Sequence, residues 1–286
     1  MPKPPPSLHE RPSTIQEALD RAVLALRNHR LDEAERLAAG VLKSNRGHVL
    51  AAQLLGQALL QQGRAQEALD PLRGAARRSG DPATETLLAR ALADTGRGEE
   101  ALDQLRQATA RRPAYPQAFL ELGDQLAKLG RFDEAAGAFQ AGLALAPDAA
   151  VLRMGLGYLH LQRNDRAGAR RLFLEVRAMA PERRDARIAL ANLMALDGEY
   201  AAAADLYRQA LAALPDDAVT RIALAKCLLE MGERAAGEAA LRAAARGPAQ
   251  AAGLAITALA AAPHGRVFLR PSAAAKFLGL EANGGS

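Results

Sequence analysis

The feature of this sequence that most constrains its fold is an internal repeat of 34 residues. Three consecutive segments align without a gap, and each has Leu at its seventh position, an aromatic residue at its twenty-fourth and Pro at its thirty-second. A fixed period of this length is typical of architectures in which one supersecondary unit stacks on the next. Extended outward from 116–149, 150–183 and 184–217, the frame predicts four more units, at 15–48, 49–81, 82–115 and 218–251.

Small residues occupy two positions of every unit. All fourteen residues at the eighth and twentieth positions are Ala or Gly, and because these residues form about a third of the chain, chance agreement is about one in ten million. Two helices approach closely only where the side chains at their crossing are small. We therefore expect the eighth and twentieth positions to face each other across a helix pair, with the bulky seventh and twenty-fourth residues filling the space around them.

Local signals also favour helix pairs. The chain contains 68 Ala, the residue with the best helix propensity. Pro at the thirty-second position suits a connection between helices, because it lacks an amide hydrogen and disfavours helix in the residue before it. Glycines that follow the first helix of a unit are typical of helix ends, and they stand at Gly63, Gly96, Gly130 and Gly198.

These units resemble the tetratricopeptide repeat, which has small residues at positions eight and twenty, a bulky apolar residue at twenty-four and Pro at thirty-two. The resemblance covers residues 15–251. The aromatic residue that the family carries at position four is present in the central unit as Phe119, whereas the next two units have Arg153 and Arg187. The resemblance implies an all-α, right-handed solenoid of about seven helix pairs, whose first helices line a concave groove.

The segments outside the repeat are predicted to play other roles. Residues 1–14 form a Pro-rich arm that we expect to be disordered, as we do residues 281–286. Residues 252–280 are expected to form a C-terminal capping helix and a tail, because a solenoid has an open apolar face at its end. The tail, residues 263–280, either packs on the solenoid or docks elsewhere through Val267, Phe268, Leu269 and Phe277.

The resemblance also implies which side chains point into the groove. They are the residues at positions two, five, nine, twelve and thirteen of the first helices. Amide, charged and apolar groups together suit a bound peptide or helix, and we expect Tyr158, Ile188 and Ile222 to be exposed apolar contacts. The alternative is a merely solvated helix face. The predicted groove residues are Arg90, Asp94, Gln117, Leu120, Asp124, Lys128, Met154, Tyr158, Gln162, Ile188, Asn192, Ile222 and Lys226.

No sequence motif points to catalysis, a cofactor or a metal. A phosphate-binding loop is missing, and Gly155 and Gly157 lack the third glycine and the preceding strand of a dinucleotide site. The five His do not have the spacing of a zinc site. The single Cys227 excludes an internal disulfide and is interpreted as a buried, inert thiol. We therefore expect a protein that is not an enzyme and has no cofactor.

Charge and hydropathy exclude two classes of partner. The net charge of +5 is spread along the chain instead of being clustered, so nucleic acid is not an expected partner. No apolar run is long enough to cross a membrane, and no secretory signal is recognisable, so a cytoplasmic location is expected. The excess of Arg over Lys favours a bacterial source. Three Arg doublets are interpreted as structural charges on helices: Arg77-Arg78, Arg111-Arg112 and Arg170-Arg171.

The function predicted from the sequence is a non-catalytic scaffold or adaptor for protein–protein interaction, which binds a peptide or helix of a partner protein in its groove. Two alternatives remain open. The chain could be the partner-recruiting, regulatory subunit of a transferase or assembly complex that acts in trans, or it could assemble with itself through its C-terminal tail. An RNA-reading repeat protein is disfavoured, because the groove has as many acids as bases and few aromatic residues for stacking.

Overall fold

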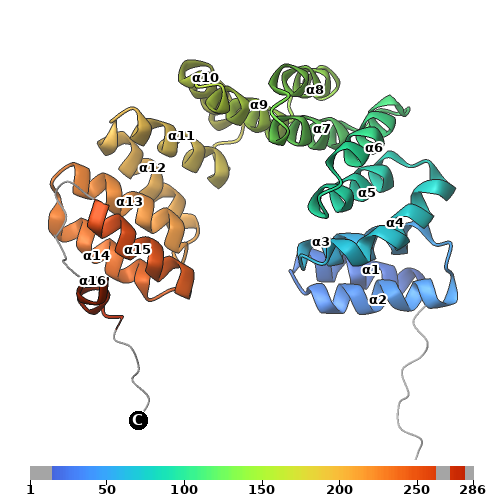
Figure 1. Cartoon of the computed structure of the whole chain (residues 1–286), viewed down its shortest axis with the longest axis horizontal. Coiled ribbons are helices and arrows are strands. Elements are labelled where there is room, and N and C mark those ends of the chain that lie inside the picture. Colours follow the sequence, from blue (N-terminus) through green and yellow to red (C-terminus); the bar gives the residue numbers. More distant parts are fainter. Residues whose placement is uncertain (1–14, 262–270, 281–286) are drawn as a thin grey trace, which may run out of the picture. The chain divides into compact units, whose positions relative to one another are not determined.

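The computed structural model describes residues 15–261 and 271–280, and this part of the chain contains sixteen helices and no strand. The predicted all-α class is confirmed (Figure 1). The predicted arm at 1–14, the tail residues 262–270 and the end at 281–286 lie outside the described residues. The helices are α1 (Ile15–Arg27), α2 (Leu31–Ser44), α3 (Val49–Gln61), α4 (Ala65–Ser79), α5 (Pro82–Asp94), α6 (Gly98–Ala110), α7 (Pro116–Lys128), α8 (Phe132–Leu145), α9 (Ala150–Gln162), α10 (Arg166–Met179), α11 (Arg184–Leu196), α12 (Tyr200–Ala213), α13 (Ala218–Glu230), α14 (Arg234–Ala245), α15 (Ala249–Ala261) and α16 (Pro271–Phe277).

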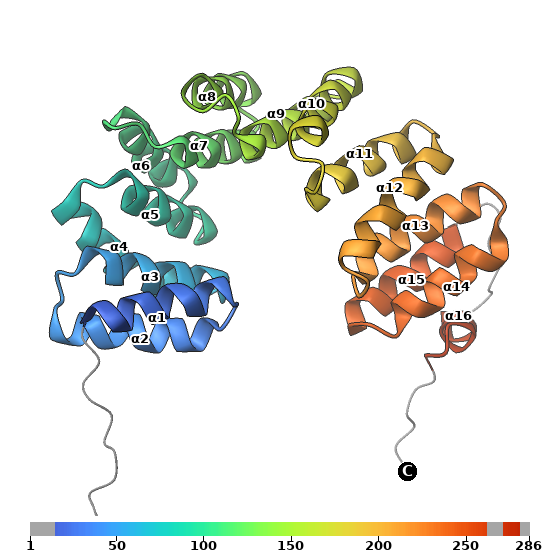
Figure 2. The ribbon, with the colours of Figure 1, turned by 180° about the vertical axis from the view of Figure 1, so that it is seen from behind.

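The chain divides into two compact units, and the boundary falls inside α9, between Gly155 and Leu156. In the first unit α1 packs on α3, α3 on α5 and α5 on α7. In the second unit α11 packs on α13, and α13 on α15. Within each unit these odd-numbered helices therefore lie side by side, as the ribbons also show from behind (Figure 2). The division into seven repeats stays a prediction.

The small residues at the eighth position are required by the bulky residue at the twenty-fourth. All fourteen side chains or Cα groups at the eighth and twentieth positions are buried. A Cβ atom added to Gly123 would lie 2.5 Å from the ring of Phe139, and one added to Gly157 would lie 2.5 Å from the ring of Phe173. The aromatic ring of the second helix thus occupies the volume that a side chain on the first helix would need.

The eighth and twentieth positions also meet in the last helix pair. A Cβ atom added to Gly237 of α14 would lie 3.2 Å from the carbonyl oxygen of Ala225 and 2.7 Å from Leu229, both of α13. This contact is the one that the small-residue pattern predicts. The glycines predicted to end first helices have positive φ, for example +74° at Gly63 and at Gly130.

Position four, where the family carries an aromatic residue, is polar in most of this chain. In three successive units an Arg stands there, and its guanidinium donates a hydrogen bond to the carbonyl oxygen of the Pro six residues earlier. The pairs are Arg153 with Pro147, Arg187 with Pro181, and Arg221 with Pro215. These bonds satisfy a carbonyl oxygen in the connection between repeats.

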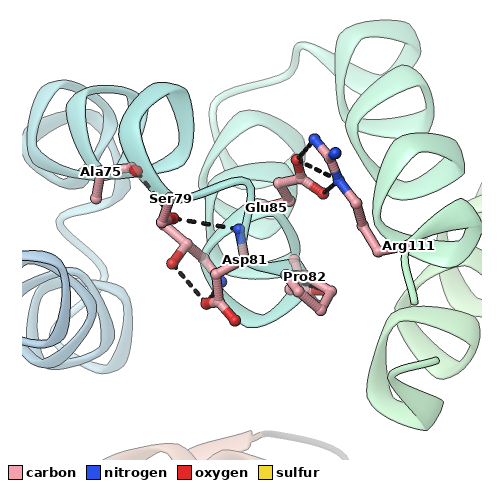
Figure 3. Close-up of polar contacts among 8 residues, drawn as sticks. Ala75, Ser79, Asp81, Pro82, Glu85 and Arg111 are labelled. Atoms are coloured by element: carbon pink, nitrogen blue, oxygen red, sulfur yellow. Dashed lines mark hydrogen bonds and ion pairs between the residues drawn. The ribbon is translucent and has the colours of Figure 1, made fainter. Parts of the chain in front are cut away.

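In the unit at 82–115 the fourth position is Glu85, whose side chain is only 3% exposed. Nη2 of Arg111 donates a hydrogen bond of 2.6 Å to its Oε1 (Figure 3). Arg111 directly follows α6 and joins that helix end to α5. The structural role predicted for this Arg doublet is therefore real, although the decisive partner is a buried carboxylate and not a helix dipole.

The turn from α4 to α5 is built from local hydrogen bonds, also drawn in Figure 3. The hydroxyl of Ser79 donates to the carbonyl oxygen of Ala75 (3.0 Å) and accepts from the amide of Asp81 (3.2 Å). The carboxylate of Asp81 accepts from the amide of Thr84 at 2.9 Å and thereby caps α5. Such a cap satisfies a free amide in the first turn of a helix and sets where the helix begins.

The C-terminal helices cover the end of the second unit. Leu278 is buried, and the side chain of Phe277 packs against the apolar core formed by α13, α14 and α15. The guanidinium carbon of Arg242 lies 4.8 Å from the centre of the Phe277 ring. The described part of the tail thus supplies apolar contacts that shield the final helix pair.

Candidate functional site

The predicted groove residues lie on the odd-numbered helices from α5 to α13, distributed over both units. Five of the thirteen line a groove within one of the units. Arg90 and Gln117 line a groove in the first unit, whereas Asn192, Ile222 and Lys226 line a different groove in the second unit. The remaining eight line neither groove: Asp94, Leu120, Asp124, Lys128, Met154, Tyr158, Gln162 and Ile188.

The groove of the second unit, called the apolar groove here, runs between α11, α13 and α15 and has a volume of about 580 Å³. One large apolar side chain of each helix lines it and stands exposed: Leu196 (62%), Val219 (63%) and Leu254 (45%). Alanines from the same three helices complete much of the lining. Exposed apolar side chains that converge on one hollow usually mark a binding surface.

Helix α13 forms the floor of the apolar groove along most of its length. Its contribution begins at Val219, continues through Ile222 and Ala223, and ends at Lys226 and Glu230. A helix of 13 residues is about 20 Å long. The floor therefore offers an apolar half, near the start of α13, and a half that carries one positive and one negative charge. A segment of about three helical turns would match it.

A buried tyrosine orients the amide of Asn192 in the apolar groove. The hydroxyl of Tyr207 donates a hydrogen bond of 2.6 Å to Oδ1 of Asn192. Because the oxygen is engaged, the two N–H groups of Nδ2 are the donors that remain for a ligand. Tyr207 stands at the twenty-fourth position, where the two preceding units have Phe139 and Phe173. The added hydroxyl was the sequence signal for this contact, and the repeat pattern alone did not reveal it.

The expected trio of exposed apolar contacts needs correction. Ile222 is 5% exposed and forms part of the groove floor, so little of its side chain is available for contact with a ligand. Ile188 is only partly exposed, and Met154, also predicted for the groove, is buried. Tyr158 is exposed, but its ring packs edge-on against Phe173 at a centroid distance of 5.3 Å. Packing of neighbouring helices, which positions within a repeat do not reveal, buries these side chains.

The groove of the first unit, called the polar groove here, runs between α3, α5 and α7 and has a volume of about 390 Å³. Amide and charged groups line it, among them Gln57, Arg90 and Gln117. Gln53 is engaged within the protein, because its Nε2 donates to Asp81 at 2.6 Å. The polar groove is therefore suited to hydrogen bonding, although Leu50, Leu54 and Leu87 also line it.

The ionisable groups with displaced pKa values include Asp124 of α7 and Cys227 of α13. Burial, reinforced by the charge of Glu121, raises the pKa of Asp124 to about 6. Burial also raises the pKa of the Cys227 thiol to about 11, so this thiol is protonated at neutral pH and is a poor nucleophile. Within residues 15–261 and 271–280, no cluster of His, Cys, Asp or Glu has the composition of a metal site, and no helix is long and apolar enough to cross a membrane.

Comparison with family models shows to which protein family the chain belongs. One model described as the tetratricopeptide repeat matches residues 86–150 and 154–218, and a second with the same description matches residues 194–261. Together they cover more than half of the sequence. The chain belongs to the tetratricopeptide repeat family. A third model, described as subunit 3 of the anaphase-promoting complex or cyclosome, matches residues 27–108.

Solved structures, two of them described as tetratricopeptide repeat proteins, share the fold. A thermophilic protein of the family from Thermus thermophilus is 25% identical, with a TM-score of 0.59 over 63% of this chain and 99% of the other. PilF of Pseudomonas aeruginosa is 20% identical, with a TM-score of 0.58 over 68% and 88%. A tetratricopeptide repeat protein from Parabacteroides merdae is 16% identical, with a TM-score of 0.60 over 93% and 98%. No curated protein matches the sequence.

Tetratricopeptide repeat proteins are typically non-catalytic scaffolds for protein–protein interaction, and this chain has their fold. The family frame also explains one omission in the sequence analysis. Val219 occupies position two of its unit, one of the positions that the resemblance directs into the groove, so it could have been included. Leu254 could not, because it lies beyond residue 251, where the last predicted repeat ends.

Proposed function

We propose that this protein is a non-catalytic scaffold whose apolar groove binds an amphipathic helix of a partner protein. The observation that supports the proposal is the convergence of Leu196, Val219 and Leu254, from three different helices, on one hollow. Burying apolar area of this kind supplies most of the binding free energy in complexes of helices with grooves.

The polar groups of the apolar groove define the rest of the partner helix. Lys226 and Glu230 lie one helical turn apart on α13, and Asn192 presents its amide donors from α11. A complementary helix carries an apolar stripe for the half near Val219, and an acidic residue that can reach Lys226. Because Tyr207 already holds Asn192, the groove loses little side-chain entropy when the partner binds.

Photo-crosslinking tests this proposal directly. A photoreactive phenylalanine analogue is placed at Val219 or at Leu254 of the tagged full chain, in a lysate of the source organism. The matched control carries the analogue at Met179, which is exposed on α10 of the same unit but lies outside the apolar groove. We expect both groove positions to capture the same partner segment, with the sequence pattern of an amphipathic helix, and position 179 not to capture it.

A second variant makes the test decisive. The double substitution Val219→Asp and Leu254→Asp places two charges on the apolar surface without touching the core, because both side chains are exposed. Capture from an analogue at Leu196 must then disappear, whereas Met179→Asp must leave it intact. Equal capture from position 179, or capture that survives the double substitution, would show that the groove assignment is wrong.

A further inference from the structure

A second hollow lies on the other side of α5 from the polar groove. It is called the outer furrow here, has a volume of about 510 Å³ and runs between α4 and α6. Helix α5 forms its floor with Glu85, Leu88 and Leu92, whereas Thr86 and Arg90 of the same helix line the polar groove. The two surfaces share no lining residue, so the outer furrow is separate from both grooves.

The carboxylates of the outer furrow are already paired with guanidinium groups. Glu85 accepts from Arg111 at 2.6 Å, as Figure 3 shows. The carboxylates of Glu100 and Asp103, both on α6, accept hydrogen bonds from arginines of the same helix or of its N-terminal cap. The hydrogen bonds with Arg97 also hold the pKa of Glu100 below its usual range. The three pairs are Glu85 with Arg111, Glu100 with Arg97, and Asp103 with Arg106.

The guanidinium groups of the furrow, by contrast, have donors to spare. Arg77 is exposed and has no hydrogen bond or ion pair with any residue that the structure describes. The ion-pair partner of Arg73 is Asp70, 3.8 Å away and almost fully exposed outside the furrow. Arg111 uses Nε and Nη2 on Glu85, while Nη1 has no hydrogen bond within the described part of the chain. The missing acceptors must therefore come from water or from a ligand.

Glu85 holds one of these guanidinium groups in place. It fixes Arg111 from the buried side, and the guanidinium also lies against Gly80, where an added Cβ atom would be 3.5 Å from Cζ. A guanidinium fixed in this way binds a planar oxyanion through two hydrogen bonds at a low cost in side-chain entropy. Arg73 and Arg77 come from the facing helix, α4.

We propose that the outer furrow is a second docking site, which binds an acidic side chain of a partner protein, either a carboxylate or a phosphoryl group. Arg77 and Arg73 bind the anion from α4, and Arg111 contributes from the end of α6. A polyanion such as RNA fits poorly, because Glu100 and Asp103 stand on the exposed wall of the same furrow. A peptide brings a single acidic group to the arginines and so meets less repulsion from those carboxylates than a polyanion does.

Binding of labelled peptides to the full chain, followed by fluorescence anisotropy at low salt, tests the proposal. The probes are a Glu-rich peptide, a phosphoserine peptide and a Gln-containing counterpart. We expect the two anionic peptides to bind and the Gln peptide not to bind. Tighter binding of the phosphoserine peptide identifies the phosphoryl group as the natural ligand, and tighter binding of the Glu peptide identifies the carboxylate.

The double variant Arg73→Gln and Arg77→Gln should weaken anionic-peptide binding by about tenfold or more, since a hydrogen bond to a charged group is worth at least one such factor. The matched control is the pair Arg27→Gln and Arg36→Gln, which removes two exposed positive charges from α1 and α2, outside the outer furrow and both grooves, and should leave binding unchanged. Equal loss in the control, no loss in the double variant, no binding of either anionic peptide, or tighter binding of an RNA oligonucleotide at this site would overturn the proposal. The charged apolar-groove variant described above should bind these peptides normally, so the two proposals fail independently.

Discussion

The two grooves use equivalent helices for different chemistry. In the first unit amides and charges such as Gln57, Arg90 and Gln117 line the hollow beside a few leucines. In the second unit the corresponding hollow presents Leu196 and Val219, joined by a side chain of the capping helix. Apolar area supplies affinity, whereas a polar lining mainly selects among ligands. The comparison indicates that one backbone arrangement can present hollows of different polarity.

The units also differ beneath the surface. The twenty-fourth position of the α7–α8 pair is Phe139, which only packs, whereas the same position in α12 is Tyr207, which packs and also reaches Asn192. The fourth position is a buried Glu85 in the first unit and an exposed, backbone-bound Arg187 in the second. Both differences connect a structural position to a surface group, and both can be tested by substitution.

The largest expected effect separates the two grooves. Val219→Asp with Leu254→Asp should weaken binding of the crosslinked partner segment by about a hundredfold, because two buried contacts become unpaired charges. Arg90→Gln in the polar groove should change it by less than about twofold, a small fraction of one hydrogen bond. Isothermal titration calorimetry measures both. A comparable loss for Arg90→Gln would mean that the two grooves hold one ligand.

A second prediction concerns the helix crossing of the first unit. Gly123→Ala forces a methyl group against Phe139 and should lower the free energy of unfolding by about 1–3 kcal/mol. The control Gly137→Ala lies on the exposed face of α8, with no atom within 4 Å of the added Cβ, and should raise it by up to about 1 kcal/mol. Urea unfolding measures the free energy of unfolding of both variants. Equal values for Gly123→Ala and Gly137→Ala would contradict the packing role of position eight.

The third prediction compares the two kinds of interaction made at position four, the ion pair of Glu85 and the backbone hydrogen bond of Arg187. Arg111→Ala leaves Glu85 buried without its partner and should lower the free energy of unfolding by about 1–3 kcal/mol. Adding Glu85→Gln should recover part of that loss, because the residual buried charge is removed. Arg187→Ala in the second unit should lower it by about 1 kcal/mol or less, since a single exposed hydrogen bond is lost. A double-mutant cycle by chemical denaturation gives the coupling energy, and the absence of coupling would contradict the pairing.

The hydroxyl of Tyr207 should matter for binding more than for stability. Tyr207→Phe reproduces the residue found in the two preceding units, frees the amide of Asn192 to rotate, and should weaken partner binding by about tenfold. The free energy of unfolding should fall by about 1 kcal/mol, the value of one hydrogen bond. Asn192→Ala is the companion variant, and adding it to Tyr207→Phe should cause little further loss. Independent, additive losses would argue against orientation through the tyrosine.

The smallest effect depends on pH. The pKa of Asp124 is raised to about 6 from an ordinary 3.8, so its ionised form costs stability above pH 6 and that cost is absent below pH 3.8. Asp124→Asn should therefore stabilise the protein by about 1 kcal/mol at pH 7, after allowance for its partial exposure. The gain should vanish near pH 4. Thermal unfolding across this range measures it, and a gain independent of pH would exclude the titration of Asp124.

Several features could be predicted from particular residues in the sequence. Paired small residues such as Gly157 and Ala169 indicated helix pairs, and Gly63 and Gly130 indicated where first helices end. The face that Asn192 and Lys226 share followed from positions nine of successive units. These are periodic properties, and a period is visible in a sequence because each unit repeats the same packing requirement.

The exposure and the hydrogen-bond partners of individual side chains were not predictable in the same way. Ile222 occupies a groove position and is nevertheless buried, because α15, most of which follows the last predicted repeat, packs against α13. Leu254 completes the apolar groove from that same helix, and no repeat position points to it. Arg77 has the same sequence signature as the structural arginines, and only the absence of an acceptor around it in the described structure distinguishes it.

By itself, the sequence determined the helical repeat and its small-residue crossings, because these depend on spacing along one chain. The tertiary structure alone decided which apolar side chains stay exposed, which arginines find a carboxylate and which amide is held by a tyrosine. Those outcomes depend on contacts between residues far apart in sequence, and packing density and hydrogen-bond satisfaction select them only when the helices are in place.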